Sequence, residues 1–257
     1  MFSNMEYFVK PGNIVREIWG KSDTILFIFA GAAAEFALNK AVDWLYFTGK
    51  LPADPIGRLF STVSYARKIV FSEKEAAYQA IDKITAIHSS IEAARKSAIP
   101  DWAYRDVLFM LIHYSIAAYE LLERKLNDKE KDEVYQVFYE MGTRMHLKEL
   151  PPTYIKWLPV RDAHMQNDLA LSNYTTDLFK QYKKHLGSVR FKILIESQKL
   201  VVPAIAKKLL KMDGTQWLKP AIPTYKLFRL LHLDGLARAA ILPSKYKEEF
   251  KALNNPT

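Results

Sequence analysis

The segment that most constrains the fold is residues 107–122, VLFMLIHYSIAAYELL. If this run forms a helix, apolar side chains surround nearly its whole circumference, with His113 and Glu120 among the few interruptions. A helix that is apolar all round has no face suited to water and must be enclosed by other elements. The segment therefore predicts a central helix in an all-α, multi-helix bundle.

The composition of the whole chain agrees with a helical fold. Only 9 of the 257 residues are glycine, and the period-two alternation of half-buried strands is scarce. We find no internal repeat, low-complexity tract or composition shift that marks a boundary between domains. We expect one all-helical domain over residues 1–257, with residues 213–257 as a C-terminal arm punctuated by Pro220, Pro223 and Pro243.

Several helix boundaries can be predicted from local signals. Asp54 precedes a proline and is expected to cap a helix over residues 55–71. The sequences Ser72–Glu75 and Asn127–Glu130 have the pattern of a capping box, in which two side chains satisfy backbone N–H groups at a helix start. Each is expected to begin a helix.

Glycine and proline predict further helix ends. Pro151-Pro152-Thr153 is expected to break the chain and cap a new helix, and Gly187 to close a helix ending near His185. Residues 189–212 have the pattern of a long basic amphipathic helix, which Pro203 is expected to kink or interrupt.

The absence of cysteine and the positive charge limit the classes of function. Without cysteine there are no disulfides, thiolate zinc sites, iron–sulfur clusters or thiolate-bound haem. The formal net charge is +9, but the basic residues are interleaved along predicted helices and form no recognition arm. We therefore expect a solvated basic surface and no nucleic-acid partner.

The most apolar run is expected to be a buried helix rather than a membrane span. The apolar run covers residues 25–34 and is followed by Glu35 and further polar residues. It is too short to cross a bilayer, which needs about 20 apolar residues. The first ten residues lack the order of a signal peptide. We expect a cytoplasmic protein. Peripheral membrane contact through the basic helix from Val189 and the leucine-rich residues 230–236 stays open.

His88 is the first candidate ligand. It lies in the stretch 76–94, AAYQAIDKITAIHSSIEAA, in the middle of a helical apolar stripe. The other members of this stripe are Ala77, Ile81, Ile84, Ile91 and Ala94. An imidazole in such a position is either a core side chain with hydrogen-bonded nitrogens or a metal or haem ligand. The residues alone leave both interpretations open.

His113 is the second candidate, with Asp106 and Glu120 about two helical turns away on either side. These carboxylates could orient the imidazole, although a structural role is as consistent with the pattern. Glu92 follows His88 by four residues and could share a metal with it. The remaining histidines, His146, His164, His185 and His232, form no paired motif, and the signatures of di-iron bundles and zinc hydrolases are absent.

Arg58 and Thr62 are four residues apart on the helix expected after Asp54, with Tyr65 on nearly the same side. A guanidinium, a hydroxyl and a phenol could together bind a carboxylate, such as a haem propionate, or line an oxygen pocket. The alternative is an exposed arginine beside a threonine that hydrogen-bonds its own helix.

The order of these pieces resembles one family. The sequence Asp54-Pro55-Ile56-Gly57-Arg58-Leu59 is followed by Thr62, Val70-Phe71 and Ile87-His88. This order is similar to that of the haem-dependent oxygenases that include latex-clearing (rubber) oxygenases and the fungal MpaB oxygenase. Further similar segments are Ile112-His113, residues 117–120, residues 149–154 and Leu242-Pro243, so that the resemblance extends from about Ile14 to Phe250.

The resemblance implies an all-α fold around a non-covalent haem b, with His88 as the ligand of the iron. Arg58 and Thr62 would lie near the haem, and His113 would belong to its pocket. The implied activity is oxidation of an apolar small molecule with dioxygen. Glu35 is then the candidate base, because apolar surroundings favour the protonated form of a carboxylate.

Three positions differ from the family pattern. Ser61 stands where rubber oxygenases carry a lysine, Gly31-Ala32 where many members have His-Pro, and Glu92 where a basic residue is common. These differences argue against rubber as the substrate and leave open a member without haem. The alternative function is therefore a non-catalytic helical protein that binds a lipid or isoprenoid, and a third is a peripheral membrane protein.

Overall fold

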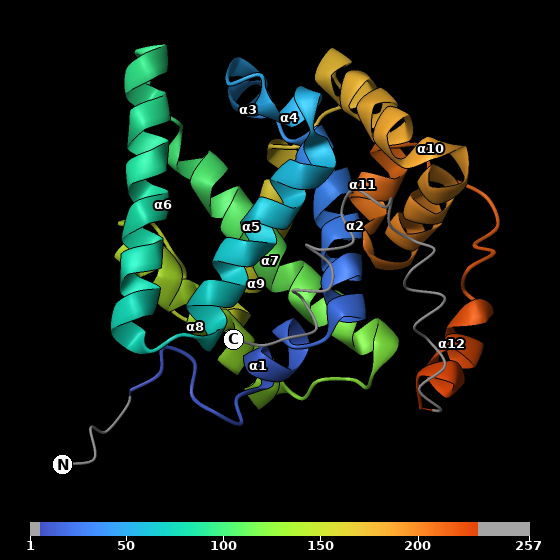
Figure 1. Cartoon of the computed structure of the whole chain (residues 1–257), viewed down its shortest axis with the longest axis horizontal. Helices are drawn as coiled ribbons and strands as arrows, with labels where there is room; N and C mark the ends of the chain where they lie inside the picture. The colour runs from blue at the N-terminus through green and yellow to red at the C-terminus, as the bar shows by residue number, and fades with distance from the viewer. Residues whose placement is uncertain (1–5, 231–257) are drawn as a thin grey trace.

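The computed structural model describes residues 6–230, and within them it confirms the all-α prediction. The described part of the chain forms helices without any strand, apart from two isolated bridges (Figure 1). The helices are α1 (Ile14–Trp19), α2 (Ser22–Leu38), α3 (Asp43–Phe47), α4 (Lys50–Ala53), α5 (Pro55–Phe71), α6 (Lys74–Arg95), α7 (Asp101–Leu122), α8 (Asp128–Arg144), α9 (Tyr154–Asn167), α10 (Asn173–Val201), α11 (Ala204–Leu209) and α12 (Ala221–Leu230).

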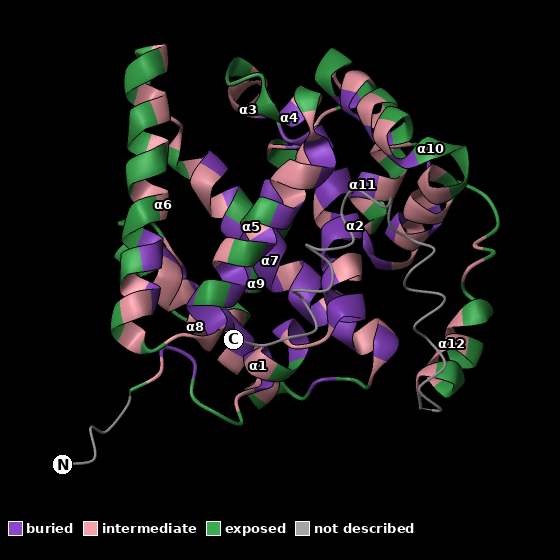
Figure 2. Ribbon diagram, viewed as in Figure 1, coloured by how far each residue is buried: buried purple, intermediate pink, exposed green. Residues whose placement is uncertain are grey.

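The centre of the bundle is formed by α2 and α7. Helix α7 packs against α2, α8 and α10, and α2 packs in addition against α10 and α11 (Figure 1). Both central helices are lined with buried residues, as the purple segments of Figure 2 show. The predicted central helix at residues 107–122 is thus confirmed. The apolar run 25–34 is likewise part of a buried helix, and no helix among residues 6–230 combines the length and apolarity that crossing a membrane requires.

The two central helices approach closely at Gly31. A Cβ atom on Gly31 would lie 2.2 Å from Cδ1 of Tyr114, well inside any real contact distance. The ring of Tyr114 therefore occupies the place where any other residue at position 31 would put its side chain. Glycine is required here by packing, although it is a poor helix former.

Several predicted caps are present. Asp54 accepts a hydrogen bond from the backbone N–H of Gly57 at 3.0 Å, and Thr153 accepts one from Lys156 at 3.3 Å. Asn127 and Glu130 form the complete capping box, with both hydrogen bonds at 2.9 Å. These signals are local, so they act as the sequence predicts.

The capping box predicted at Ser72–Glu75 is wrong. Ser72 ends α5, while α6 begins at Lys74 and has no side-chain cap at Glu73. The segment before α1 takes over this role, because the backbone N–H of Lys74 donates to the carbonyl of Glu6 at 2.7 Å and that of Phe8 to Ser72 at 3.4 Å. A tertiary contact thus satisfies the backbone groups that a local motif was expected to satisfy.

The two breaks predicted around residues 189–212 are present. Gly187, whose φ of 75° and ψ of 165° are not helical, separates two helical pieces that meet at a kink within α10 (Asn173–Val201). Pro203 interrupts the predicted helix and caps the separate helix α11. The described residues end at Leu230, the last residue of α12. The rest of the predicted arm lies outside them, including His232, Pro243 and the leucine-rich residues 231–236.

Candidate functional site

The second half of α6 is much less covered than the first. Ala77, Ala80 and Ile81 are buried, whereas no residue from 82 to 95 is. The C-terminal end of α6 is nevertheless fastened, because Arg95 pairs with Asp43 at 2.6 Å and lies 4.0 Å from the ring centroid of Trp44. The helix stands at the edge of the molecule beside α5 (Figures 1 and 2). The predicted apolar stripe is therefore core in its first half only.

His88 lies within this thinly covered half. Its ring is partly exposed, but Nδ1 is buried and has no hydrogen-bond partner among the described residues. The ring of Tyr104 on α7 lies 5.1 Å from it, centroid to centroid. Burial, and then the charge of Arg58, lower the pKa of His88 and favour the neutral imidazole, the form that binds metals. The first interpretation of His88, a core histidine with satisfied nitrogens, is not what the structure shows at Nδ1.

Arg58 and Thr62 lie on the facing helix α5. The guanidinium of Arg58 donates to the hydroxyls of Ser61 at 3.0 Å and Thr62 at 3.4 Å. Burial lowers the pKa of Arg58, and in the described part of the chain no carboxylate pairs with it. The charge of Arg58 on α5 acts on the imidazole of His88 on α6, and the two helices pack against each other. The structure thus brings Arg58, Thr62 and His88 into one region.

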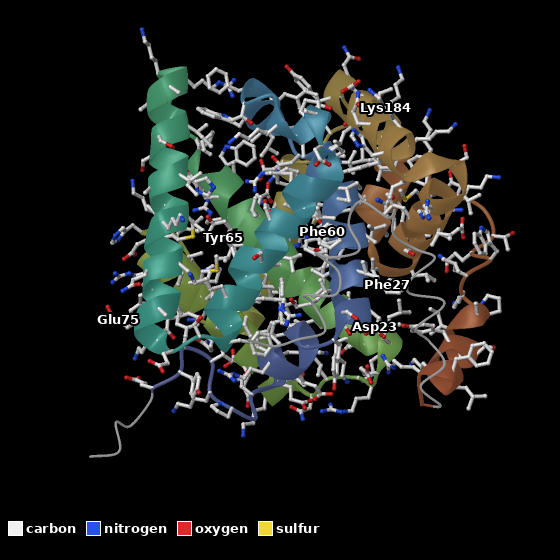
Figure 3. All side chains as sticks on the ribbon, in the orientation of Figure 1. Asp23, Phe27, Phe60, Tyr65, Glu75 and Lys184 are labelled. Carbon is white, nitrogen blue, oxygen red and sulfur yellow. The ribbon has the colours of Figure 1, made fainter. Side chains whose placement is uncertain are left out.

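A cavity of about 490 Å³ lies further along the same pair of helices. Figure 3 shows Tyr65 on α5 facing α6, where it lines this cavity. The other lining residues are Ser61, Ser64, Lys68, Gln79, Ala80 and Lys83. Arg58, Thr62 and His88 do not line it, so the cavity borders the candidate site through Ser61 and is not the site itself.

Glu92 has hydrogen-bond partners of its own at the end of α6. Its Oε1 accepts hydrogen bonds from the backbone N–H of Ile99 at 2.7 Å and the hydroxyl of Tyr104 at 3.1 Å. Glu92 thereby fixes the α6–α7 connection and the ring of Tyr104 beside His88. The structure shows this structural role for Glu92, and a metal shared with His88 stays a prediction.

Glu35 lies in the centre of the bundle and is completely buried. Arg161 of α9 donates to its two carboxylate oxygens at 2.6 and 2.5 Å, and Tyr114 of α7 donates to Oε2 at 2.7 Å. Both oxygens are therefore engaged by protein donors. This geometry holds α2, α7 and α9 together through one charged group.

His113 lies next to this centre, its ring 5.0 Å from that of Tyr114. The imidazole of His113 forms a hydrogen bond with the backbone of Val201. The carboxylates expected to orient it are elsewhere: Asp106 contacts His164, and Glu120 pairs with Lys125 and Lys131. Helical spacing predicts that Asp106 and Glu120 lie on the same side of α7 as His113, but both carboxylates are engaged by residues of other segments.

The titration of His113 predicts an acid-sensitive fold. Burial, and then the charge of Arg161, lower the pKa of His113 from 6.5 to about 4. In the unfolded chain His113 becomes protonated below about pH 6.5, whereas in the folded chain it becomes protonated only near pH 4. The free energy of unfolding therefore falls as the pH falls from 6.5 to 4. The difference corresponds to at most about 3 kcal/mol at pH 4.

Urea unfolding of the wild type and of His113→Gln between pH 7 and 4 measures this contribution. Glutamine keeps a donor for Val201 but does not titrate. We expect the wild type to lose up to about 3 kcal/mol more than the variant over this range. Parallel stability curves for the two proteins would show that His113 is not held neutral.

Sequence reasoning missed Arg161, His164 and Asp168. The sequence shows no paired motif at His164, but this residue is buried on α9 with both ring nitrogens against carboxylates. The spacing of His164 and Asp168, four residues apart at a helix end, was the available signal. Arg161, three residues earlier, gave no signal of its own, because its partner Glu35 is remote in sequence.

The comparison with protein families decides the identity of the chain. The family described as "ER-bound oxygenase mpaB/B'/Rubber oxygenase, catalytic domain" matches residues 19–250. The chain belongs to this family. The resemblance derived from the motifs is thus confirmed, and with it a general oxygenase function. The comparisons with curated proteins and with solved structures found no match.

The family match covers all the residues discussed as site candidates, from Glu35 to His113, and also Arg161, His164 and Asp168. It extends from the end of α1 into the C-terminal arm and is consistent with one domain. The match assigns no role to individual residues. The roles of Arg58, Thr62, His88, His113 and Glu35 stay predictions, to which the geometry above is relevant.

Proposed function

We propose that this protein is a haem-b-dependent oxygenase that acts on an apolar small molecule with dioxygen, and that His88 is the protein ligand of the haem iron. The observation that carries the proposal is the buried Nδ1 of His88, which no described residue hydrogen-bonds, on a helix face that the core leaves only partly covered. Buried polar atoms normally have partners, and an orphan atom on an imidazole is consistent with a ligand role.

Arg58 supports the same proposal by its charge. It is a partly buried cation that hydrogen-bonds hydroxyl groups, and within residues 6–230 no carboxylate pairs with it. An anionic group such as a haem propionate would supply the missing negative charge. Thr62 would orient the guanidinium, since its hydroxyl accepts from Arg58 and donates to the Arg58 carbonyl at 3.2 Å.

A bound haem would supply the redox chemistry of iron, which no side chain of this chain can supply. The residues of the chain would supply position, water exclusion and electrostatics. His88 would hold the group against α6, Arg58 would bind its anionic edge, and Tyr104 would pack against the imidazole and limit its rotation. The Tyr104 hydroxyl is itself fixed by Glu92.

The buried centre around Glu35 has a different role in this proposal. A general base needs an oxygen free to accept a proton from a substrate, and both oxygens of Glu35 already accept from Arg161 and Tyr114. We infer that Glu35 is a positioning residue, which fixes α7 and hence the neighbouring His113. His113, neutral and beside this charged centre, would form the inner wall of the haem pocket.

Hemin titration of the purified protein tests the proposal. We expect a Soret band that saturates at one haem per chain, and we expect His88→Ala to lose it. His88→Gly should regain the band when imidazole is added, because free imidazole can replace the missing ligand. The control is His185→Ala, a histidine on α10 to which the proposal gives no role, and this variant should bind hemin as the wild type does.

Arg58→Ala adds a second measurement. Loss of one charge-assisted contact should weaken hemin binding on the order of tenfold without removing the band. If the folded wild type gives no Soret band with hemin, the oxygenase proposal is contradicted. The non-catalytic lipid- or isoprenoid-binding protein would then be the better description.

A further inference from the structure

A second cluster of potential ligands lies on the other side of the central helix α7. Asp106 of α7 faces His164 of α9, and Asp168 follows directly after α9. Ligand atoms of these three residues lie within 4.8 Å of one another. The cluster is separate from the α5–α6 region, and the proposed oxygenase function does not use it.

The imidazole of His164 is held between two carboxylates. Its Nε2 contacts Oδ1 of Asp106, and its Nδ1 contacts Oδ2 of Asp168. Asp106 is completely buried and His164 is 8% exposed, and in the described part of the chain Oδ1 of Asp106 and Nε2 of His164 have no partner other than each other. Two deeply buried polar atoms therefore meet at one point that no further donor or acceptor of the described residues reaches.

The orientation of Asp106 is fixed from behind. Asn39 donates from Nδ2 to Oδ2 of Asp106 at 2.5 Å, while its own Oδ1 accepts from the backbone N–H of Ala41 at 2.8 Å. This leaves Oδ1 of Asp106 directed towards His164. Carboxylates that bind metals are commonly held by such a second group, which sets their direction.

The charges around the cluster also favour a cation. Asp106 and Asp168 bring two negative charges to one imidazole. Of the neighbouring charged groups, Glu35 and Arg161 neutralise each other, and Arg105 pairs with Glu149 at 2.5 Å. Buried charges are normally paired or bound to a metal, so the fully buried Asp106 calls for a positive partner.

We propose that Asp106, His164 and Asp168 bind one divalent first-row transition-metal ion, which fastens α9 to α7. One imidazole nitrogen and two carboxylate oxygens suit zinc or manganese better than the all-oxygen sites of calcium and magnesium. Asp168, with 23% of its side chain exposed, gives the ion a path from solvent. Three protein ligands leave coordination positions for water.

Calorimetric titration of chelator-treated protein with Zn²⁺, and separately with Mn²⁺, tests the site. We expect one ion of at least one of these metals per chain and a rise in melting temperature on binding. Asp168→Asn removes one ligand with almost no change in shape and at a partly exposed position, so the fold should be kept. It should weaken binding at least about tenfold and abolish the rise in melting temperature.

Two controls separate this site from other binding. Asp162→Asn changes an exposed carboxylate on the same helix, and His88→Ala removes the proposed haem ligand. Both should bind the ion as the wild type does, so failure of the haem proposal would leave this result unchanged. The inference is overturned if neither metal binds stoichiometrically, or if folded Asp168→Asn binds as tightly as the wild type. The cluster would then be a histidine held between two carboxylates without an ion.

Discussion

Replacing Arg161 with leucine is expected to lower the free energy of unfolding by about 3–5 kcal/mol. The substitution removes the partner of Glu35, which is completely buried between α2, α7 and α9. The carboxylate would keep the hydrogen bond from Tyr114 but would have no positive charge near it. An unpaired buried charge is among the most destabilising changes a fold can undergo.

The double variant Glu35→Leu/Arg161→Leu gives the control for this result. It removes both charges and leaves apolar groups in apolar surroundings, which is often close to neutral. We expect urea unfolding to show that the double variant regains most of the stability lost by Arg161→Leu. If the stability losses of Glu35→Leu and Arg161→Leu, each measured alone, add up to that of the double variant, the two side chains do not interact. The destabilisation then has another origin.

Gly31→Ala is expected to destabilise the protein by roughly 1–3 kcal/mol or more. In an exposed helix the same change is stabilising by about 1 kcal/mol, so the sign itself is diagnostic. The new methyl group would collide with the ring of Tyr114, 2.2 Å away. The ring cannot easily turn aside, because its hydroxyl is bound to Glu35.

A double-mutant cycle with Tyr114→Ala isolates this contact. Tyr114→Ala removes the ring that Gly31→Ala would strike, and thermal or urea unfolding gives the four stabilities. On the Tyr114→Ala background, Gly31→Ala should be neutral or stabilising. An equal loss of stability on both backgrounds would mean that the close approach of α2 and α7 at Gly31 does not depend on Tyr114.

The sequence predicts those parts of the fold that depend on neighbouring residues. The enclosure of α7 follows from apolar side chains on nearly every face, and the caps at Asp54, Asn127 and Thr153 follow from side chains that reach three residues along the chain. The start of α6 could not be predicted in this way. Its backbone groups are satisfied by Glu6, remote in sequence.

The same distinction holds for the candidate site. The stripe around His88 and the spacing of Arg58 and Thr62 are local, and the structure places these three residues in one region. The partners of Glu35 and Asp106 are not local, since Arg161 and His164 reach them from α9. Helical spacing relates only residues of the same helix. The clusters around Glu35 and Asp106 combine residues of different helices, so they can be identified only from the packed structure.

The uneven burial of α6 has a thermodynamic consequence. This helix has few apolar contacts along its second half, and its own contribution to the native state there is small. A ligand bound at His88, as proposed, would add its binding free energy at this thinly covered half of α6. Ligand binding and the ordering of α6 would then be coupled equilibria. The concentration of the ligand would therefore set how resistant newly synthesised protein is to proteolysis.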